Sequence, residues 1–264
     1  MTWQFAAMLL VLTAAILLWG TLVNRMSVNT TRIYRITGYI GVPIHELAHA
    51  LVCVVFGMRI TKVSFFRHNS ETGAMGQVSF RYSPYSMGHA LGLALQGVAP
   101  MLAGAAIVYL VLGIQTDLPG GAGQDVFQWI SGSAVWTVTA ARMLATESLL
   151  GTLLVLLVLS VSMHCIPSRA DILTGLRGLA VLTALGAAVA VAFDLFWMVE
   201  YELGDRFGYL VAKVLVGFER GMQIALAAVV GQVVMAIIGG VLLILVPSII
   251  LYAVAFLRGA RGKI

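Results

Sequence analysis

Residues 41–51 of this chain read GVPIHELAHAL. On a helix, His45 and His49 lie one turn apart and project from the same face. Two imidazoles at that spacing can bind one zinc ion, and Glu46 lies beside them, where it can take a proton from a water molecule that the metal activates. The flanking residues, from 33 to 56, are mostly apolar, so three titratable groups fall inside a predicted membrane span. Such groups are costly in lipid, and this placement therefore indicates a functional site.

The composition predicts an integral, multi-pass membrane protein. Of the 264 residues, 60% are hydrophobic and only 10% are charged, with a mean hydropathy of +0.98, whereas a soluble domain carries about 25% charged residues. The net charge of +5 does not indicate a nucleic-acid partner, because the basic residues are scattered through the loops and at the C-terminus. Basic residues so placed are typical of cytoplasmic loops that meet anionic lipid.

A length of about 20 apolar residues per crossing predicts an all-α polytopic membrane protein with about six transmembrane helices. The expected spans are residues 3–23, 33–57, 88–112, 149–167, 176–198 and 225–257. The last is too long for one straight crossing, so either Gly239-Gly240 and Pro247 break it or its start lies along the interface. A slight excess of Lys and Arg in the corresponding loops favours a bacterial-type cytoplasmic membrane with both termini cytoplasmic.

The segment between the second and third spans has a different pattern. Residues 77–82, QVSFRY, alternate apolar and polar side chains as a half-buried strand does. Residues 60–66 are the candidate partner strand, and residues 69–76 supply turn residues. The sequence therefore predicts a small membrane-associated β-hairpin, which lies at the interface or is covered by protein because an open sheet edge cannot face lipid.

A catalytic zinc ion usually has three protein ligands and one open position for water. The candidates for the third ligand are His68, His89, His164, Asp171, Asp194 and the pair Glu200 and Glu202. Asp171 is favoured, because it ends MHCIPSRAD (residues 163–171), where a proline and small residues can break a helix at membrane depth. Alternatively, Ser168 caps the next helix and Asp171 complements its dipole. The two roles are compatible in one residue.

Three further polar residues in this segment are candidates for supporting the ligands or contacting substrate: His164, Ser168 and Arg169. His164 either bonds to Asp171 or a substrate backbone, or is a hydrogen-bonded core histidine. Arg169 either polarises a substrate carbonyl or extends to the lipid headgroups.

Four motifs resemble those of the site-2 protease family of intramembrane zinc metalloproteases. HELAH at residues 45–49 is followed by FGMRITKVSF at 56–65, as the family's zinc motif is followed by a glycine and a short strand. GVAP at 97–100 is similar to the family's Gly-Pro element. HCIPSRAD at 164–171 occupies the place of its Asn-x-x-Pro…Asp-Gly motif, whose Asp is the third zinc ligand.

This chain departs from the family pattern at three points. His164 stands where Asn is usual, the spacing from proline to aspartate is one residue shorter, and Ile172 follows the aspartate where Gly is usual. The resemblance covers residues 33–175. It implies a metalloprotease-like core there, within a single membrane domain of residues 1–264 whose residues 176–264 form additional C-terminal transmembrane helices.

The resemblance implies a zinc metalloendopeptidase that hydrolyses peptide bonds of membrane-embedded proteins by metal-activated water, in regulated intramembrane proteolysis. His45, His49 and Asp171 would hold one Zn²⁺ per chain, and Glu46 would be the catalytic base. The expected partners are a transmembrane protein substrate, the lipid bilayer and a regulatory membrane partner of unknown identity. The alternatives are a non-proteolytic zinc-binding scaffold or transport component, and a small permease in which the motif has no role.

Overall fold

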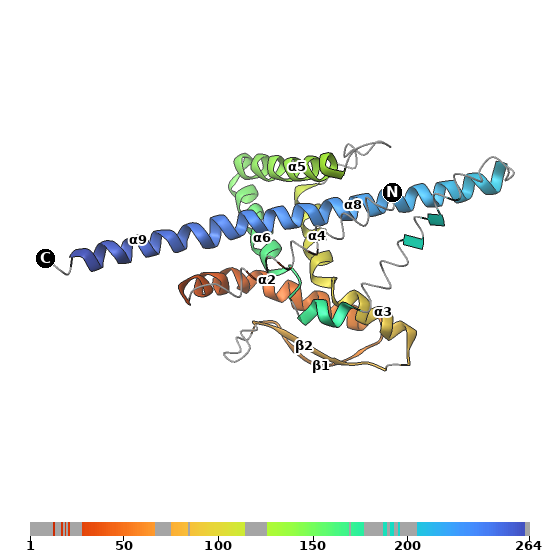
Figure 1. Ribbon diagram of the computed structural model, residues 1–264, viewed down its shortest axis with the longest axis horizontal. Coiled ribbons are helices and arrows are strands. Elements are labelled where there is room, and N and C mark those ends of the chain that lie inside the picture. Colours follow the sequence, from red (N-terminus) through yellow and green to blue (C-terminus); the bar gives the residue numbers. More distant parts are fainter. Residues whose placement is uncertain are drawn as a thin grey trace.

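The computed structural model describes residues 28–66, 75–83, 85–113, 126–168, 170–176 and 205–261, together with isolated positions in 13–21 and 187–195. This part of the chain is mostly helical and contains one small two-stranded antiparallel sheet (Figure 1). The expectation of a helical protein with a hairpin is confirmed.

Helix α2 (Val28–Val55) carries the HELAH sequence and continues through Pro43 without interruption. It ends where Gly57 adopts a left-handed conformation, with φ of 67°. The N–H of Met58 then donates to the carbonyl oxygen of Cys53 at 2.8 Å, a closure typical of helix C-termini. This turn directs the chain away from α2 and into the first strand.

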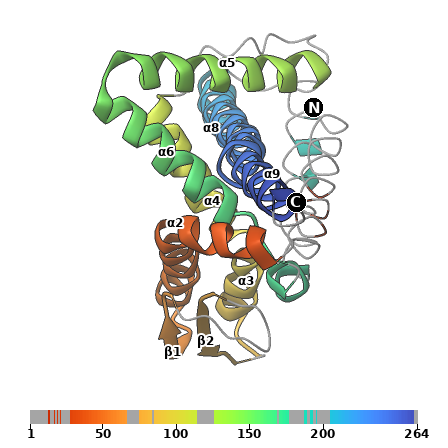
Figure 2. The same cartoon turned by 90° about the vertical axis from the view of Figure 1, so that its left-hand side faces the viewer.

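The hairpin consists of β1 (Arg59–Ser64) and β2 (Gln77–Arg81), which pair in antiparallel register. Ile60 lies opposite Phe80, and the register shifts by an irregularity between Ile60 and Lys62. The two strands lie beside α2 and α3, at the end of the molecule opposite α5 (Figure 2). Both expected strands are therefore present, each within a few residues of its predicted bounds.

The third expected span is two helices, α3 (Met87–Gln96) and α4 (Ala99–Leu112), which meet at an angle of 64°. Pro100 lies in the first turn of α4, where its missing N–H costs no hydrogen bond. Apolar length alone predicted one span over residues 88–112. The structure shows two helices bent after Gln96, which form either one broken span or a re-entrant loop.

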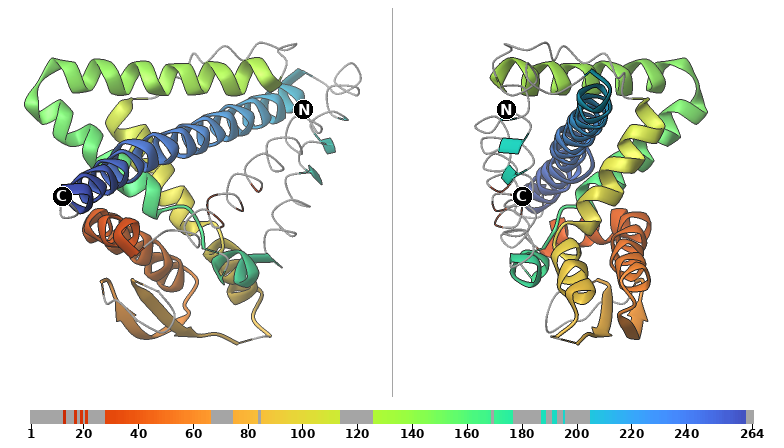
Figure 3. Two further views of the ribbon diagram at one scale, coloured as in Figure 1. Left: turned by 60° about the vertical axis from the view of Figure 1, so that its left-hand side comes forward. Right: turned by 90° about the vertical axis from the view of Figure 1, so that its right-hand side faces the viewer.

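The remaining helices form a bundle above the hairpin. Helix α5 (Val126–Glu147) lies across one end, and α6 (Leu149–His164) returns beside α4 (Figures 1 and 3). Helix α8 (Asp205–Gly239) packs against α4, α5 and α6. Apolar side chains fill the space between these helices, among them Val108, Val158 and Met235. Cys53 and Cys165 are buried and unpaired.

The last helix does not break where Gly239-Gly240 and Pro247 suggested. Six residues, η1 (Gly240–Leu245), are π-helical, and α9 (Val246–Arg261) continues in the same direction (Figure 1). Pro247 has no N–H to donate to the preceding turn of an α-helix. The π-helical residues before it form a wider turn, which accommodates the proline.

Two helical segments in the described part of the chain are long and apolar enough to cross a membrane, Tyr34–Val55 and Gln223–Phe256. The α3–α4 pair makes a third if it is one bent span. This is fewer than the six expected. Helix α6 has 16 residues, fewer than the roughly 20 that a crossing needs. The expected spans at 3–23 and 176–198 lie almost wholly outside the described residues.

Candidate metal centre

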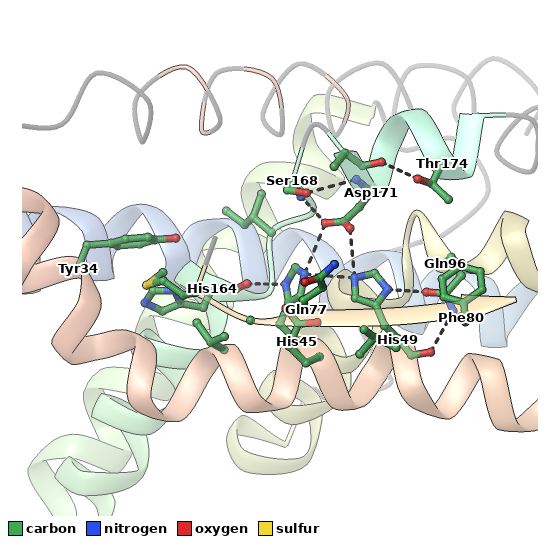
Figure 4. A pocket seen from close by; sticks show the side chains of 17 residues that line it. Tyr34, His45, His49, Gln77, Phe80, Gln96, His164, Ser168, Asp171 and Thr174 are labelled. Carbon is green, nitrogen blue, oxygen red and sulfur yellow. Dashed lines mark hydrogen bonds and ion pairs between the residues drawn. The ribbon is translucent and has the colours of Figure 1, made fainter. Parts of the chain in front are cut away.

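His45 and His49 project from one face of α2, as their spacing predicted (Figure 4). Their rings meet edge to face with centroids 4.9 Å apart, and their Nε2 atoms are 3.2 Å apart. Both side chains lie at the wall of a cavity of about 450 Å³. The helix therefore directs two ring nitrogens to one point.

Asp171 comes to the same point from the helical residues 170–176. Its Oδ2 lies 3.4 Å from Nε2 of His45, and its Oδ1 lies 3.2 Å from Nε2 of His49. Ligand atoms on one tetrahedral zinc ion, at bond lengths of about 2.0–2.1 Å, are about 3.3 Å apart. The two nitrogens and the carboxylate therefore have the chemistry and the spacing of a three-ligand metal site, and these three residues could hold an ion.

Asp171 also caps its own helix. Its Oδ2 accepts from the backbone N–H of Ser168 at 2.7 Å, and its own N–H donates to the Ser168 hydroxyl oxygen at 3.2 Å. The capping interpretation and the ligand interpretation thus describe one carboxylate. Burial acts to raise the pKa of Asp171. When the two imidazoles are protonated, hydrogen bonds and positive charge from His45 and His49 outweigh this effect and hold the pKa of Asp171 below its usual range.

The opposite nitrogen of each imidazole has a hydrogen-bond partner that can only accept. Nδ1 of His45 lies 2.8 Å from the main-chain oxygen of His164, and Nδ1 of His49 lies 2.6 Å from Oε1 of Gln96. A neutral imidazole has one N–H, so with Nδ1 as the donor each Nε2 presents a lone pair. Two lone pairs and a carboxylate that face one another are a donor set that could hold a metal ion.

His164 supports the site through its backbone rather than through a bond to Asp171. Its ring lies against α2, with Nε2 3.0 Å from the Thr37 hydroxyl and the ring stacked on Tyr34 at 4.2 Å between centroids. A Cβ at Gly41 would lie 2.6 Å from Cβ of His164, so the glycine permits this close approach. The ring is in the position of the hydrogen-bonded core histidine that was the alternative expectation.

Glu46 is buried and lines the same cavity as the two histidines. The start of β2 lies directly on it, because a Cβ at Gly76 would be 2.6 Å from the Glu46 Oε1 atom. Strand β2 also contributes Gln77, Val78 and Phe80 to the cavity wall. The hairpin therefore forms one side of the site.

Of the other candidates for the third ligand, the structure describes His89 and His164, and neither ring is part of the cluster of three ligands. His89 lies at the start of α3, where its Nδ1 accepts from the N–H of Ser83 at 2.8 Å. Four candidates lie outside the described residues: His68, Asp194, Glu200 and Glu202. Arg169, a candidate for contacting substrate, lies outside them too.

Gln96 is the principal residue that the sequence analysis missed. The HELAH motif was notable partly because its polar side chains lie in an otherwise apolar segment. The same criterion, applied to residues 88–112, would have found Gln96.

Comparison of the chain with protein-family models, curated proteins and solved structures finds no match.

Proposed function

We propose that this protein is a zinc-dependent endopeptidase that hydrolyses membrane-embedded proteins. The observation that supports this most directly is the convergence of His45 Nε2, His49 Nε2 and the Asp171 carboxylate, with separations of 3.2–3.4 Å. Two histidines and one carboxylate are a common ligand set of catalytic zinc, and three protein ligands leave one position open.

When bound, zinc supplies a Lewis acid that lowers the pKa of water from 15.7 to about 7 and polarises a carbonyl group. Glu46 follows His45 directly and lines the same cavity, so it is placed to accept the proton of the attacking water. The same carboxyl then donates that proton to the amine that leaves. Its burial in the cavity wall favours proton exchange with the reactants over exchange with bulk water.

The shape of the site favours an extended polypeptide as substrate. A membrane helix hides its peptide bonds in its own hydrogen bonds, so cleavage requires local unwinding. In the described part of the chain β2 pairs on one side only, with β1, and its residues line the cavity. An unwound segment can add to its free edge by main-chain hydrogen bonds.

The site lies on a segment that can cross a membrane. His45, Glu46 and His49 all fall within Tyr34–Val55. A catalytic group there meets substrates that are themselves in the bilayer, and this separates the proposed activity from that of soluble metalloproteases.

Comparison of wild type with Glu46→Gln tests the proposal. Glutamine keeps the shape of the side chain but cannot accept the proton, so turnover should fall about 10²–10⁴-fold while zinc content stays at the wild-type value. Membranes from cells expressing each form would be analysed by mass spectrometry for new peptide termini within predicted transmembrane segments. Termini present with wild type and absent with Glu46→Gln would identify substrates.

Identical sets of termini from the two forms, with zinc bound in both, would contradict proteolysis and favour a zinc-binding scaffold or transport component. Absence of zinc from both would contradict the metal centre itself.

A further inference from the structure

We propose that Gln96 is the positioning residue of the metal centre, the group that holds His49 in the orientation and tautomer required of a ligand. Gln96 is the last residue of α3 and only 2% exposed. Its side chain reaches from the bent third segment to α2, where the HELAH motif lies. The inference rests on the proposed metal site and adds to it a residue outside the motif.

All the polar atoms of the Gln96 side chain are used on α2. Oε1 lies 2.6 Å from Nδ1 of His49, while Nε2 donates to the main-chain oxygen of His49 at 3.0 Å and to Sγ of Cys53 at 3.1 Å. A buried amide costs free energy unless it is hydrogen-bonded. Both the oxygen and the nitrogen of this amide are hydrogen-bonded, and their partners belong to His49 and Cys53, one turn apart on α2.

These contacts determine which nitrogen of His49 carries the proton. The main-chain oxygen of His49 can only accept, so the NH₂ group of Gln96 must face it and Oε1 must face the ring. Oε1 in turn can only accept, so Nδ1 of His49 is the donor. In the neutral imidazole that binds a metal ion, Nε2 is then left with its lone pair, directed at Asp171 and His45.

The residue after Gln96 acts on the third ligand. A Cβ at Gly97 would lie 2.7 Å from Cα of Gly175 and 3.0 Å from the main-chain oxygen of Asp171. The absence of a side chain at Gly97 therefore lets the helix of Asp171 pack against the bend between α3 and α4. Two consecutive residues at this bend thus support two of the three ligands.

The two histidines differ in what supports them. His45 is oriented by a main-chain oxygen, that of His164, which no substitution removes directly. His49 is oriented by a side chain, which substitution does remove. Loss of such a supporting hydrogen bond typically lowers metal affinity about 10–100-fold, and Gln96 is the position where this can be measured.

The test is a zinc titration of purified protein in detergent, in competition with a chromogenic chelator. Gln96→Leu and Gln96→Met both remove the acceptor, and methionine keeps the unbranched shape. Both should bind zinc about 10–100-fold more weakly than wild type. Gln96→Glu keeps an acceptor for Nδ1–H and should stay within a few-fold of wild type.

Gln232→Leu is the matched control, because Gln232 is also fully buried but has no hydrogen-bond partner in the described part of the chain. It should leave zinc affinity unchanged. The absorption spectrum of the Co²⁺-substituted protein, which reports ligand geometry, should change in Gln96→Met and not in Gln232→Leu.

Wild-type zinc affinity and Co²⁺ spectrum in both Gln96→Leu and Gln96→Met would overturn the inference while leaving the metal centre intact. Equal loss in Gln96→Glu and Gln96→Met would overturn it as well, since any change at the position would then act through packing. Failure of wild type to bind zinc or Co²⁺ would instead contradict the proposed function.

Discussion

In the part of the chain that the structure describes, two glutamines are buried in the apolar interior, one beside the candidate metal centre and one in the helical bundle. Gln96 is 2% exposed and makes three hydrogen bonds to α2, whereas Gln232 on α8 is 0% exposed and neither amide atom has a partner among the described residues. A buried polar atom without a partner costs about 1–3 kcal/mol. The polar atoms of Gln96 contact the candidate metal centre, whereas we expect the unpartnered amide of Gln232 to reduce stability.

The surroundings of the two glutamines also differ, being polar around Gln96 and apolar around Gln232. Around Gln96, α2, α3 and residues 165–176 meet through hydrogen bonds and glycine contacts that bring the ligands together. Around Gln232, α4, α6 and α8 meet through apolar side chains, and Gly104 allows close approach, since a Cβ there would lie 2.6 Å from Nε2 of Gln232. We therefore expect substitutions in the first region to change metal binding and turnover, and substitutions in the second to change only stability.

The largest expected effect is from substitution of Asp171. Asp171→Asn keeps an oxygen that can accept from the Ser168 N–H, but it removes the charge that a divalent ion needs. Zinc affinity should therefore fall by more than the ~10–100-fold of a lost supporting hydrogen bond, with little change in the thermal unfolding of the metal-free protein. Asp171→Ala should lose zinc affinity equally and also lose the cap.

Zinc affinity like that of wild type in Asp171→Asn would show that the residue is a cap alone. The measurement is the same competition titration, with unfolding followed by circular dichroism in excess chelator.

The next effect concerns the contact between the hairpin and Glu46. A Cβ at Gly76 would lie 2.5–2.8 Å from three atoms of the Glu46 side chain, so Gly76→Ala must displace the carboxyl or the strand. We expect turnover to fall about 10-fold or more, with zinc content unchanged. Gly217→Ala is the control, because among the described residues nothing beyond its chain neighbours and its own helix backbone lies within 4 Å of the added Cβ. Equal activity of both variants in a cleavage assay would show that the contact between Gly76 and Glu46 does not affect turnover.

A smaller effect is expected from proline in β2. Val78→Pro or Phe80→Pro removes one backbone donor from the strand, and should reduce cleavage more than it reduces zinc content. Zinc content and cleavage rate would be measured on the same preparation of each variant and expressed relative to wild type. Losses of equal size in both would point to misfolding of the hairpin rather than to a lost substrate contact.

The smallest effect is expected at Gln232, where we expect substitution to increase the stability of the protein. Gln232→Leu replaces an unpartnered amide by an apolar side chain of similar size, and should stabilise the protein by about 1–3 kcal/mol. The thermal unfolding temperature in detergent would rise by a few degrees. A fall of similar size would mean that Gln232 has a partner in the assembled protein and would end the contrast with Gln96.

The sequence was sufficient where one short pattern carries the information. The spacing of His45 and His49 predicted a shared helix face, and the alternation of residues 77–82 predicted β2. Asp171 was favoured from its position after a proline in an apolar segment, and it lies 3.2–3.4 Å from the two imidazole nitrogens.

The sequence was insufficient where the structure depends on how segments meet. Apolar length predicted one span over residues 88–112, but this segment bends after Gln96, and at the bend Gly97 lies against Gly175, almost eighty positions along the chain. The same bend brings Gln96 to His49. Neither the number of spans nor this hydrogen bond follows from hydropathy, because hydropathy records composition along the chain and not contacts across it.

We propose that His45, His49 and Asp171 hold a divalent ion, and the rest of the proposed activity depends on that ion. The most direct test is elemental analysis of wild type and His49→Ala, each purified in detergent, exposed to equal zinc and freed of excess. We expect about one zinc per wild-type chain and almost none in His49→Ala. Wild type without stoichiometric zinc, or His49→Ala with as much zinc as wild type, would contradict it.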